Sequence, residues 1–233
     1  MPNADRVTHT AQHLEQAILS GKLAPGDLLP SEREISAEMG VSRGVVREAL
    51  GRLASLGLVR ILHGSGTRVE APSGKLVATG YQILLKRGEV RLSDVAAVRL
   101  PLETAIAAEA ARRRTDDHLA RLTESQAALA NPRGALEAHV KADLAFHAVL
   151  AEATGNSLFG MVLAPIQELL IETRRRTLGR HGGAIAHDHH ALILDAVRAG
   201  DPAAAERAMR AHLEANFQHL SENPGLADAP LPN

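Results

Sequence analysis

Two short helical patterns separated by a tight turn constrain the fold of this chain more than any other feature of its sequence. Ser31 and Glu34 form a Ser-x-x-Glu capping box, which predicts the start of a helix that ends at Gly40. Two positions further on, Ser42 can cap a second helix, whose apolar residues recur at helical spacing until Gly57. Two helices joined by so short a turn form a helix-turn-helix.

The segments on either side of this motif complete a three-helix unit with a hairpin. A helical stripe over 8–20 precedes the motif. Two candidate strands, 58–62 and 67–69, follow it, and the Gly-rich stretch 63–66 between them predicts a strand–turn–strand hairpin. Three helices followed by a hairpin is the order of elements in a winged helix. We place the end of this winged helix-turn-helix domain at residue 72, in the break Ala71-Pro-Ser-Gly74.

Longer amphipathic segments replace the short ones from residue 73 onwards. Helices are expected at about 75–87, 92–113, 116–130, 133–154, 156–178, 187–199 and 202–221. Short loops between them predict an all-helical antiparallel bundle over 73–221, and the Pro- and Gly-rich residues 222–233 predict a flexible tail. Only 2% of the 233 residues are aromatic, so the core must consist of Ala, Leu, Val and Ile. The predicted fold class is therefore mainly α.

Several classes of protein are excluded by composition. The chain has no cysteine, so disulfides, thiolate catalysis and Cys-type zinc sites are excluded, and any metal must be bound by His and carboxylate groups. There is no signal segment or apolar run long enough to span a membrane, so we expect a cytoplasmic protein with no membrane partner. The net charge of −1 does not indicate nucleic-acid binding, although a balanced total can hide a basic patch.

Such a basic patch is found in the helix-turn-helix. Arg43 and Arg47 are four residues apart at the start of the second helix, where both can reach phosphate or the edge of guanine. Ser42 can present its hydroxyl to a phosphate, and His63 and Gly64 at the hairpin turn can approach the DNA backbone. An exposed arginine pair is also typical of a solvated helix face, and some winged helices bind proteins. The pattern nevertheless favours double-stranded DNA as the partner.

The first domain resembles the DNA-binding domain of the GntR family of bacterial transcription regulators. The matching segments are residues 23–35, Gly40 to Arg43, Val46 to Leu50 and His63 to Thr67. The resemblance covers about 60 residues with the spacing of that family throughout. It implies that six positions touch operator DNA: Arg33, Ser42, Arg43, Arg47, His63 and Gly64. Arg43 and Arg47 are the expected base readers, and the others are expected to position the DNA backbone.

The second part of the chain carries a possible metal-binding pattern. Asp143 and His147 are four residues apart and leave the same face of one predicted helix, while His190 and His212 belong to later helices. An aspartate with three histidines suits zinc, and equally nickel, manganese or iron. Taken alone, the spacing of the first two residues is more commonly explained by an exposed Asp–His ion pair, and it does not decide between His189 and His190 as a ligand. Arg99 and Glu103 form a similar pair, which is also typical of a helix salt bridge.

Residues 76–220 resemble the FCD effector domain of FadR-type GntR regulators. The matching features are Val98 to Glu103, Asp143 with His147, Thr154 to Asn156, His190, and Met209 with His212. The resemblance implies that Asp143, His147, His190 and His212 bind a divalent metal ion, with zinc favoured. It also implies a small carboxylate effector, for which Arg99 and Asn156 are candidate contacts, and it leaves Asp143 as the alternative partner of Arg99.

These predictions describe a ligand-responsive bacterial transcription regulator of the repressor type, a homodimer that binds operator DNA, a metal ion and a small organic or sugar acid. Two alternatives remain open. One is a metal-dependent hydrolase-type enzyme, since an ion with an open position can activate water. The other is a constitutive DNA-binding protein whose metal is purely structural. The sequence does not identify the acid, the operator or the metal, and it does not separate repression from activation.

Overall fold

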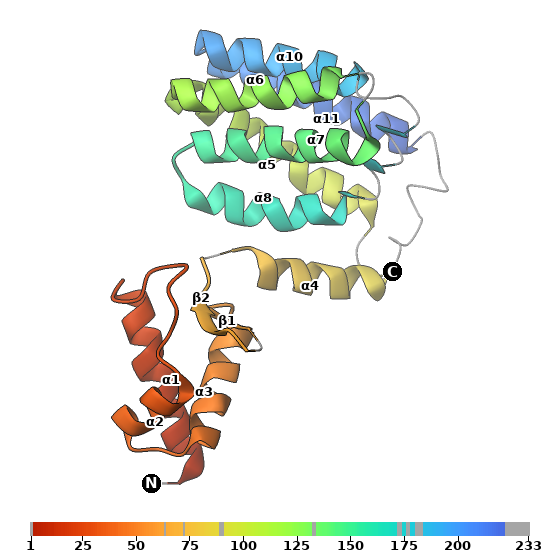
Figure 1. Ribbon diagram of the computed structural model, residues 1–233. Coiled ribbons are helices and arrows are strands. Elements are labelled where there is room, and N and C mark those ends of the chain that lie inside the picture. Colours follow the sequence, from red (N-terminus) through yellow and green to blue (C-terminus); the bar gives the residue numbers. More distant parts are fainter. Residues whose placement is uncertain are drawn as a thin grey trace. The chain divides into compact units, whose positions relative to one another are not determined.

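The computed structural model describes residues 2–62, 64–71, 73–88, 91–131, 134–171, 174–175, 178–179 and 184–221. It confirms a mainly α chain with a winged helix-turn-helix followed by a helical bundle (Figure 1). The chain divides into two compact units, Met1–Leu76 and Val77–Asn233. The predicted flexible tail, residues 222–233, lies outside the described residues.

The first unit contains the helices α1 (Asn3–Leu19), α2 (Glu32–Met39) and α3 (Arg43–Ser55) and the strands β1 (Val59–Leu62) and β2 (Gly66–Val69). The predicted caps are present: the Ser31 hydroxyl accepts the backbone N–H of Glu34, and the Glu34 carboxylate accepts the N–H of Ser31 at 2.8 Å. Gly40 ends α2 with φ +63°, a left-handed conformation that a side chain disfavours. The turn between α2 and α3 is therefore specified locally.

The helix-turn-helix is held together by a small apolar core. Its buried members come from all three helices, from both strands and from the segment before α2: Leu14, Leu29, Ile35, Val46, Leu50, Leu53, Val59 and Val69. The strands pair antiparallel, with Val59 opposite Val69 and Leu62 opposite Gly66. The segment before α2 adds to this hairpin, because the Leu29 N–H donates to the Thr67 carbonyl at 2.8 Å. The wing is thus tied to the segment leading into α2, which the sequence pattern did not predict.

The first helix begins five residues before its predicted start at residue 8. Val7, which lies in this extra turn, is fully buried and packs with Val45 and Ala49 of α3. Tertiary packing therefore stabilises a turn in which the local sequence has only two apolar residues, Ala4 and Val7, and no side-chain cap.

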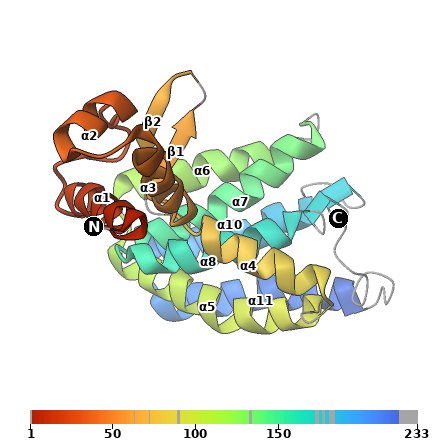
Figure 2. The same ribbon diagram turned by 90° about the horizontal axis from the view of Figure 1, so that it is seen from below.

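The boundary between the units falls in the first turn of α4 (Lys75–Lys86). The second unit comprises the rest of α4 and the helices α5 (Leu92–Arg113), α6 (Asp116–Ala130), α7 (Leu136–Ala153), α8 (Ser157–Leu169), α10 (Ala184–Ala199) and α11 (Pro202–Ser221). Figures 1 and 2 show α5 beside α11 and α6 beside α7, and α7 also packs against α8. Small residues of α5, Ala107, Ala110 and Ala111, are fully buried, so neighbouring helices can approach closely around Phe146. None of the described helices is long and apolar enough to cross a membrane.

One predicted helix is interrupted in the structure, where residues 171, 174–175 and 178–179 are helical beyond a break at Leu170. The expected helix over 156–178 ends at Leu169, and a new turn starts where the Arg174 N–H donates to the Leu170 carbonyl at 2.8 Å. Neither Gly nor Pro stands at residue 170, so helical periodicity alone did not predict the break. Two neighbouring helices differ less: α7 starts at 136 rather than 133, and α10 at 184 rather than 187.

Candidate DNA interface and candidate metal centre

The start of α3 presents the predicted DNA-contacting side chains to solvent. Ser42 caps the helix, since its hydroxyl accepts the Val45 N–H at 3.4 Å, and Arg43 and Arg47 are both exposed. Arg47 forms a weak surface pair with Glu32, in which Nε lies 3.8 Å from Oε2. Ser42, Arg43 and Arg47 therefore lie together at the N-terminal end of α3, where a recognition helix meets base edges.

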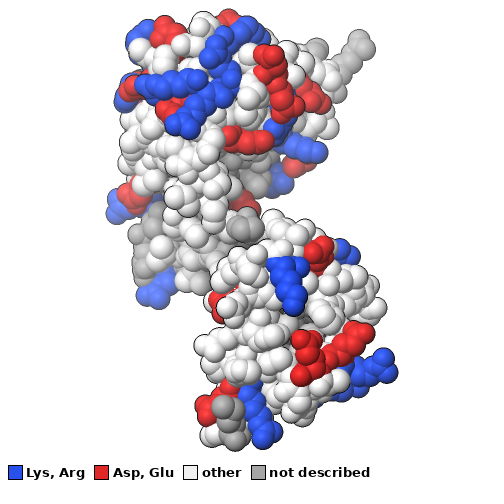
Figure 3. Space-filling view, turned by 90° about the vertical axis from the view of Figure 1, so that its left-hand side faces the viewer, with Lys and Arg blue, Asp and Glu red and all other residues white. Residues whose placement is uncertain are grey.

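Three other arginines of the first unit are ion-paired or hydrogen-bonded within it. Arg52 lies 3.1 Å from Glu48, Arg60 lies 2.7 Å from Glu70, and the Arg68 guanidinium donates to the Gly26 carbonyl. Acidic and basic side chains accordingly lie beside one another on the face shown in Figure 3. The basic patch suggested by the sequence therefore excludes these three arginines and consists of the exposed arginines at the start of α2 and α3.

The remaining predicted DNA contacts lie on α2 and in the wing. Arg33 is exposed in the first turn of α2. Gly64 is exposed in the turn between β1 and β2 with φ +77°, so a larger residue would be strained there. His63, the other predicted wing contact, lies outside the described residues.

The four predicted metal ligands come together inside the bundle. Asp143 and His147 come from α7, His190 from α10 and His212 from α11, and one ligand atom of each lies within 4.8 Å of all the others. All four are at most 5% exposed. His189, which the spacing could not separate from His190, is only half-buried, and its ring centroid lies 5.7 Å from that of His212. The structure thus places His190, and not His189, in the cluster.

The ring nitrogens of these histidines fit a metal ion. Among the described residues, both ring nitrogens of His147, both of His190 and Nδ1 of His212 have no assigned hydrogen bond, and His147 Nδ1 lies 2.6 Å from Glu103 Oε2. Burial lowers the pKa of His190 to about 3, and burial also lowers the pKa of His212 well below its usual value. Both rings are therefore neutral at pH 7 and keep a lone pair, and three nitrogens with one carboxylate oxygen suit zinc or a related ion.

Two buried arginines and a second carboxylate surround this cluster. Asp143 Oδ2 accepts a hydrogen bond from Arg174 Nε, and Glu103 Oε1 accepts one from Arg99 Nε. Burial alone would raise the pKa of both carboxyl groups. Ion pairing outweighs burial: the pKa of Asp143 stays below its usual value because of Arg174 and the neighbouring histidines. Arg99 and His147 act in the same way on the pKa of Glu103.

Arg174 is a site residue that sequence reasoning missed. It lies in a run of three arginines, Arg174 to Arg176, at the end of the predicted helix 156–178, a pattern typical of a solvated face. It follows the end of α8 at Leu169, and its side chain is only 11% exposed. Arg174, rather than Arg99, is therefore the ion-pair partner of Asp143.

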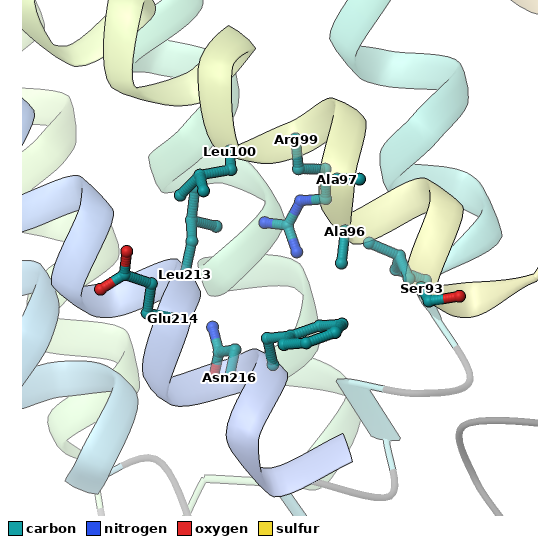
Figure 4. Close-up of a pocket in the computed structure, with 10 residues that line it drawn as sticks. Ser93, Ala96, Ala97, Arg99, Leu100, Leu213, Glu214 and Asn216 are labelled. Atoms are coloured by element: carbon teal, nitrogen blue, oxygen red, sulfur yellow. The ribbon is translucent and has the colours of Figure 1, made fainter. Parts of the chain in front are cut away.

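The two predicted effector contacts have different surroundings. Arg99 lines a cavity of about 220 Å³ between α5 and α11, and Figure 4 shows its guanidinium directed towards Asn216. Nη2 of Arg99 has no hydrogen-bond partner among the described residues. Asn156 instead caps α8, because its Oδ1 accepts the Leu158 N–H at 3.1 Å. Asn156 is exposed and does not line this cavity.

Comparison with known proteins identifies the class of protein. Residues 6–69 match the family described as bacterial regulatory proteins, gntR family, and residues 94–215 match the FCD domain. The chain therefore belongs to the GntR family, as a DNA-binding transcription regulator with an FCD domain, and it is not an enzyme.

Individual relatives narrow this assignment. The HTH-type transcriptional repressor NanR of Cronobacter sakazakii is 34% identical over 221 residues, which cover 91% of this chain and 85% of that protein. NanR of Salmonella arizonae is 33% identical over 209 residues, covering 87% and 79%. The solved structure of Streptococcus agalactiae GntR matches with a TM-score of 0.69 at 28% identity, covering 91% of this chain and 99% of that one. The chain is thus similar to NanR-type regulators over nearly its whole length.

Proposed function

We propose that this protein is a metal-containing transcriptional repressor that releases or reshapes its operator complex when a small organic or sugar acid binds in its FCD domain. The observation that carries the proposal is the buried group of Asp143, His147, His190 and His212, with its unpartnered ring nitrogens. The similar NanR proteins are named repressors, which supports repression rather than activation.

Operator contact is assigned to the exposed residues of the first unit. Arg43 and Arg47 read base edges, because both leave the first turns of α3 and guanidinium can fork onto guanine O6 and N7. Arg33, Ser42 and the wing residues His63 and Gly64 position the sugar-phosphate backbone. The protein acts in the cytoplasm as a homodimer, whose two recognition helices read half-sites about one helical turn apart.

The bundle binds the metal ion and the acid. His147, His190 and His212 provide nitrogen ligands, Asp143 provides oxygen, and zinc suits this donor set. A bound divalent ion supplies a Lewis-acidic centre with open positions for a carboxylate. Arg99 receives the remaining negative charge of the acid, because its Nη2 is unpartnered and its side chain lines the cavity between α5 and α11. Asn156 caps an exposed helix end, so its assignment to the acid has no support from its position.

The response requires that the acid bind two arrangements of the protein with different affinity. The cavity lies between α5 and α11, and Leu100 and Phe217 line it from the two sides. An acid that draws α5 and α11 together favours one arrangement of the bundle. That preference changes the separation of the two recognition helices in the dimer, and with it the fit to the half-sites.

The test combines metal analysis with operator binding. The purified protein is expected to contain about one zinc or related ion per chain, and candidate sugar acids and dicarboxylates are screened for a shift in operator affinity by gel mobility. The control for histidines outside the metal group is His139→Ala. It removes a buried histidine of α7 that contacts the Asn131 carbonyl, and it should leave the metal content unchanged. Absence of bound metal after addition of zinc would refute the metal site.

Chelation separates this proposal from a purely structural metal. If the metal supports effector binding, its removal abolishes the response to acid while the helical content persists. If removal unfolds the bundle and no acid alters operator affinity in the loaded protein, the metal is structural and repression is constitutive.

A further inference from the structure

Glu103 is a buried carboxylate that the proposed function does not use. It lies on α5, is 1% exposed and does not belong to the four-residue metal group. Its two oxygens face different partners. Oε1 accepts a hydrogen bond from Arg99 Nε, and Oε2 lies 2.6 Å from Nδ1 of His147. A fully buried carboxylate held by two functional side chains requires an explanation beyond helix stability, since burying a charge is costly.

The position of Glu103 bears on which nitrogen of His147 can bind a metal. A neutral imidazole carries one N–H and one lone pair, and a carboxylate facing one nitrogen favours the N–H there. A hydrogen on Nδ1, which lies 2.6 Å from Glu103 Oε2, leaves the lone pair on Nε2, which has no partner among the described residues. Metal-bound histidines commonly donate their second N–H to a carboxylate in this way.

We propose that Glu103 is a positioning residue that holds His147 in its Nδ1–H tautomer, so that Nε2 is available as the metal ligand, and that Arg99 holds the Glu103 carboxylate in place. This inference rests on the proposed metal site. It adds a connection between the effector cavity and the metal group, because Arg99 lines the cavity and shares Glu103 with His147.

Replacing Glu103 by glutamine tests the assignment with almost no change in shape. Glutamine has one oxygen and one NH₂ group, and the charged Arg99 takes the oxygen because charge-assisted hydrogen bonds are the stronger ones. The NH₂ group then faces His147 Nδ1 and favours the opposite tautomer, with its hydrogen on Nε2. Zinc affinity is expected to fall by about 10–100-fold.

The assay is zinc binding to the full chain by competition with a chromophoric chelator, combined with nitrogen NMR of the histidine rings at alkaline pH. The matched control is Glu109→Gln on the same helix, which loses a carboxylate paired with Arg112 and Arg113 outside the metal group. We expect the control to bind zinc like the wild type. Unchanged zinc affinity and an unchanged His147 tautomer in Glu103→Gln would overturn the proposal.

A second variant separates positioning from a general loss of stability. In the double variant Arg99→Met with Glu103→Gln, the glutamine oxygen has no arginine to accept from and is free for the His147 Nδ1–H. Zinc affinity is expected to recover relative to Glu103→Gln alone. Failure to recover, with the double variant folded, refutes the tautomer mechanism. If the wild type itself binds no zinc, the proposed function fails, and the tautomer assignment is still decided by the ring nitrogens of the metal-free protein.

Discussion

The ion pair between Arg174 and Asp143 predicts how the metal group behaves without its ion. In the metal-free protein Arg174 is the cation that hydrogen-bonds to Asp143, and the two side chains are only 11% and 7% exposed. Replacing Arg174 by methionine preserves the apolar part of the side chain and removes the charge. Asp143 then remains buried, with His190 Nε2 3.5 Å from its Oδ1.

The expected cost follows from burial. Removing one partner of a buried ion pair typically costs about 3–5 kcal/mol, because the other charge is left uncompensated. We take the lower end, about 3 kcal/mol, since His190 remains beside Asp143. For a chain of this size each kcal/mol lowers the melting temperature by about 2–4 °C, so Arg174→Met should melt about 6–12 °C below the wild type in chelator.

Zinc should reverse much of this loss. A bound dication compensates the Asp143 charge in place of Arg174, and it no longer has the positive Arg174 side chain beside it. The rise in melting temperature on adding zinc should therefore be larger for Arg174→Met than for the wild type, as ligand linkage requires of tighter binding. The assay is thermal unfolding followed by circular dichroism, in chelator and in excess zinc.

The neighbouring residue supplies the control. Arg175 Nε lies 2.6 Å from Glu137 Oε1, but both side chains are largely solvated, at 42% and 65% exposed. Arg175→Met should melt close to the wild type, because surface ion pairs contribute little. The reasoning is refuted if Arg174→Met in chelator melts within about 2 °C of the control, or if zinc stabilises both variants equally.

Three further predictions concern the DNA interface, the turn between α2 and α3, and the core of the bundle. Arg43→Ala should weaken operator binding by about 1–3 kcal/mol in gel-shift titrations. Arg60→Ala should not weaken it, because the Arg60 side chain pairs with Glu70. Equal losses in the two variants would contradict the proposal that Arg43 contacts the bases. Gly40→Ala should cost the first unit about 1–2 kcal/mol in urea unfolding, because φ is +63° there, and an unchanged midpoint would show that the turn relaxes. Phe146→Ala should destabilise the bundle by about 3–5 kcal/mol. It should also weaken zinc binding, because Phe146 stacks on His190 with ring centroids 4.1 Å apart. Unaltered zinc affinity would show that this stacking does not contribute to metal binding.

Much of the fold was predictable because its signals are local. The capping box at Ser31, the left-handed Gly40 and the cap at Ser42 are specified within a few residues of sequence, and the structure has each of them in place. The pairing of Asp143 with His147 could be predicted for the same reason, since a spacing of four residues in a helix places both side chains on one face. Element boundaries were predicted less well where packing decided them, as at Val7 in the first turn of α1.

The sequence by itself therefore determined the helix-turn-helix, the mainly helical bundle, and histidine and carboxylate as the metal-binding chemistry of a chain without cysteine. Only the tertiary structure decided which side chains meet. His189 and His190 are adjacent in sequence, but successive residues of a helix point about 100° apart, and the packing of α10 directs only His190 into the cluster. Likewise, the break after Leu169 buries Arg174 against Asp143. Such contacts join residues far apart in the chain, and no local pattern records the distance between them.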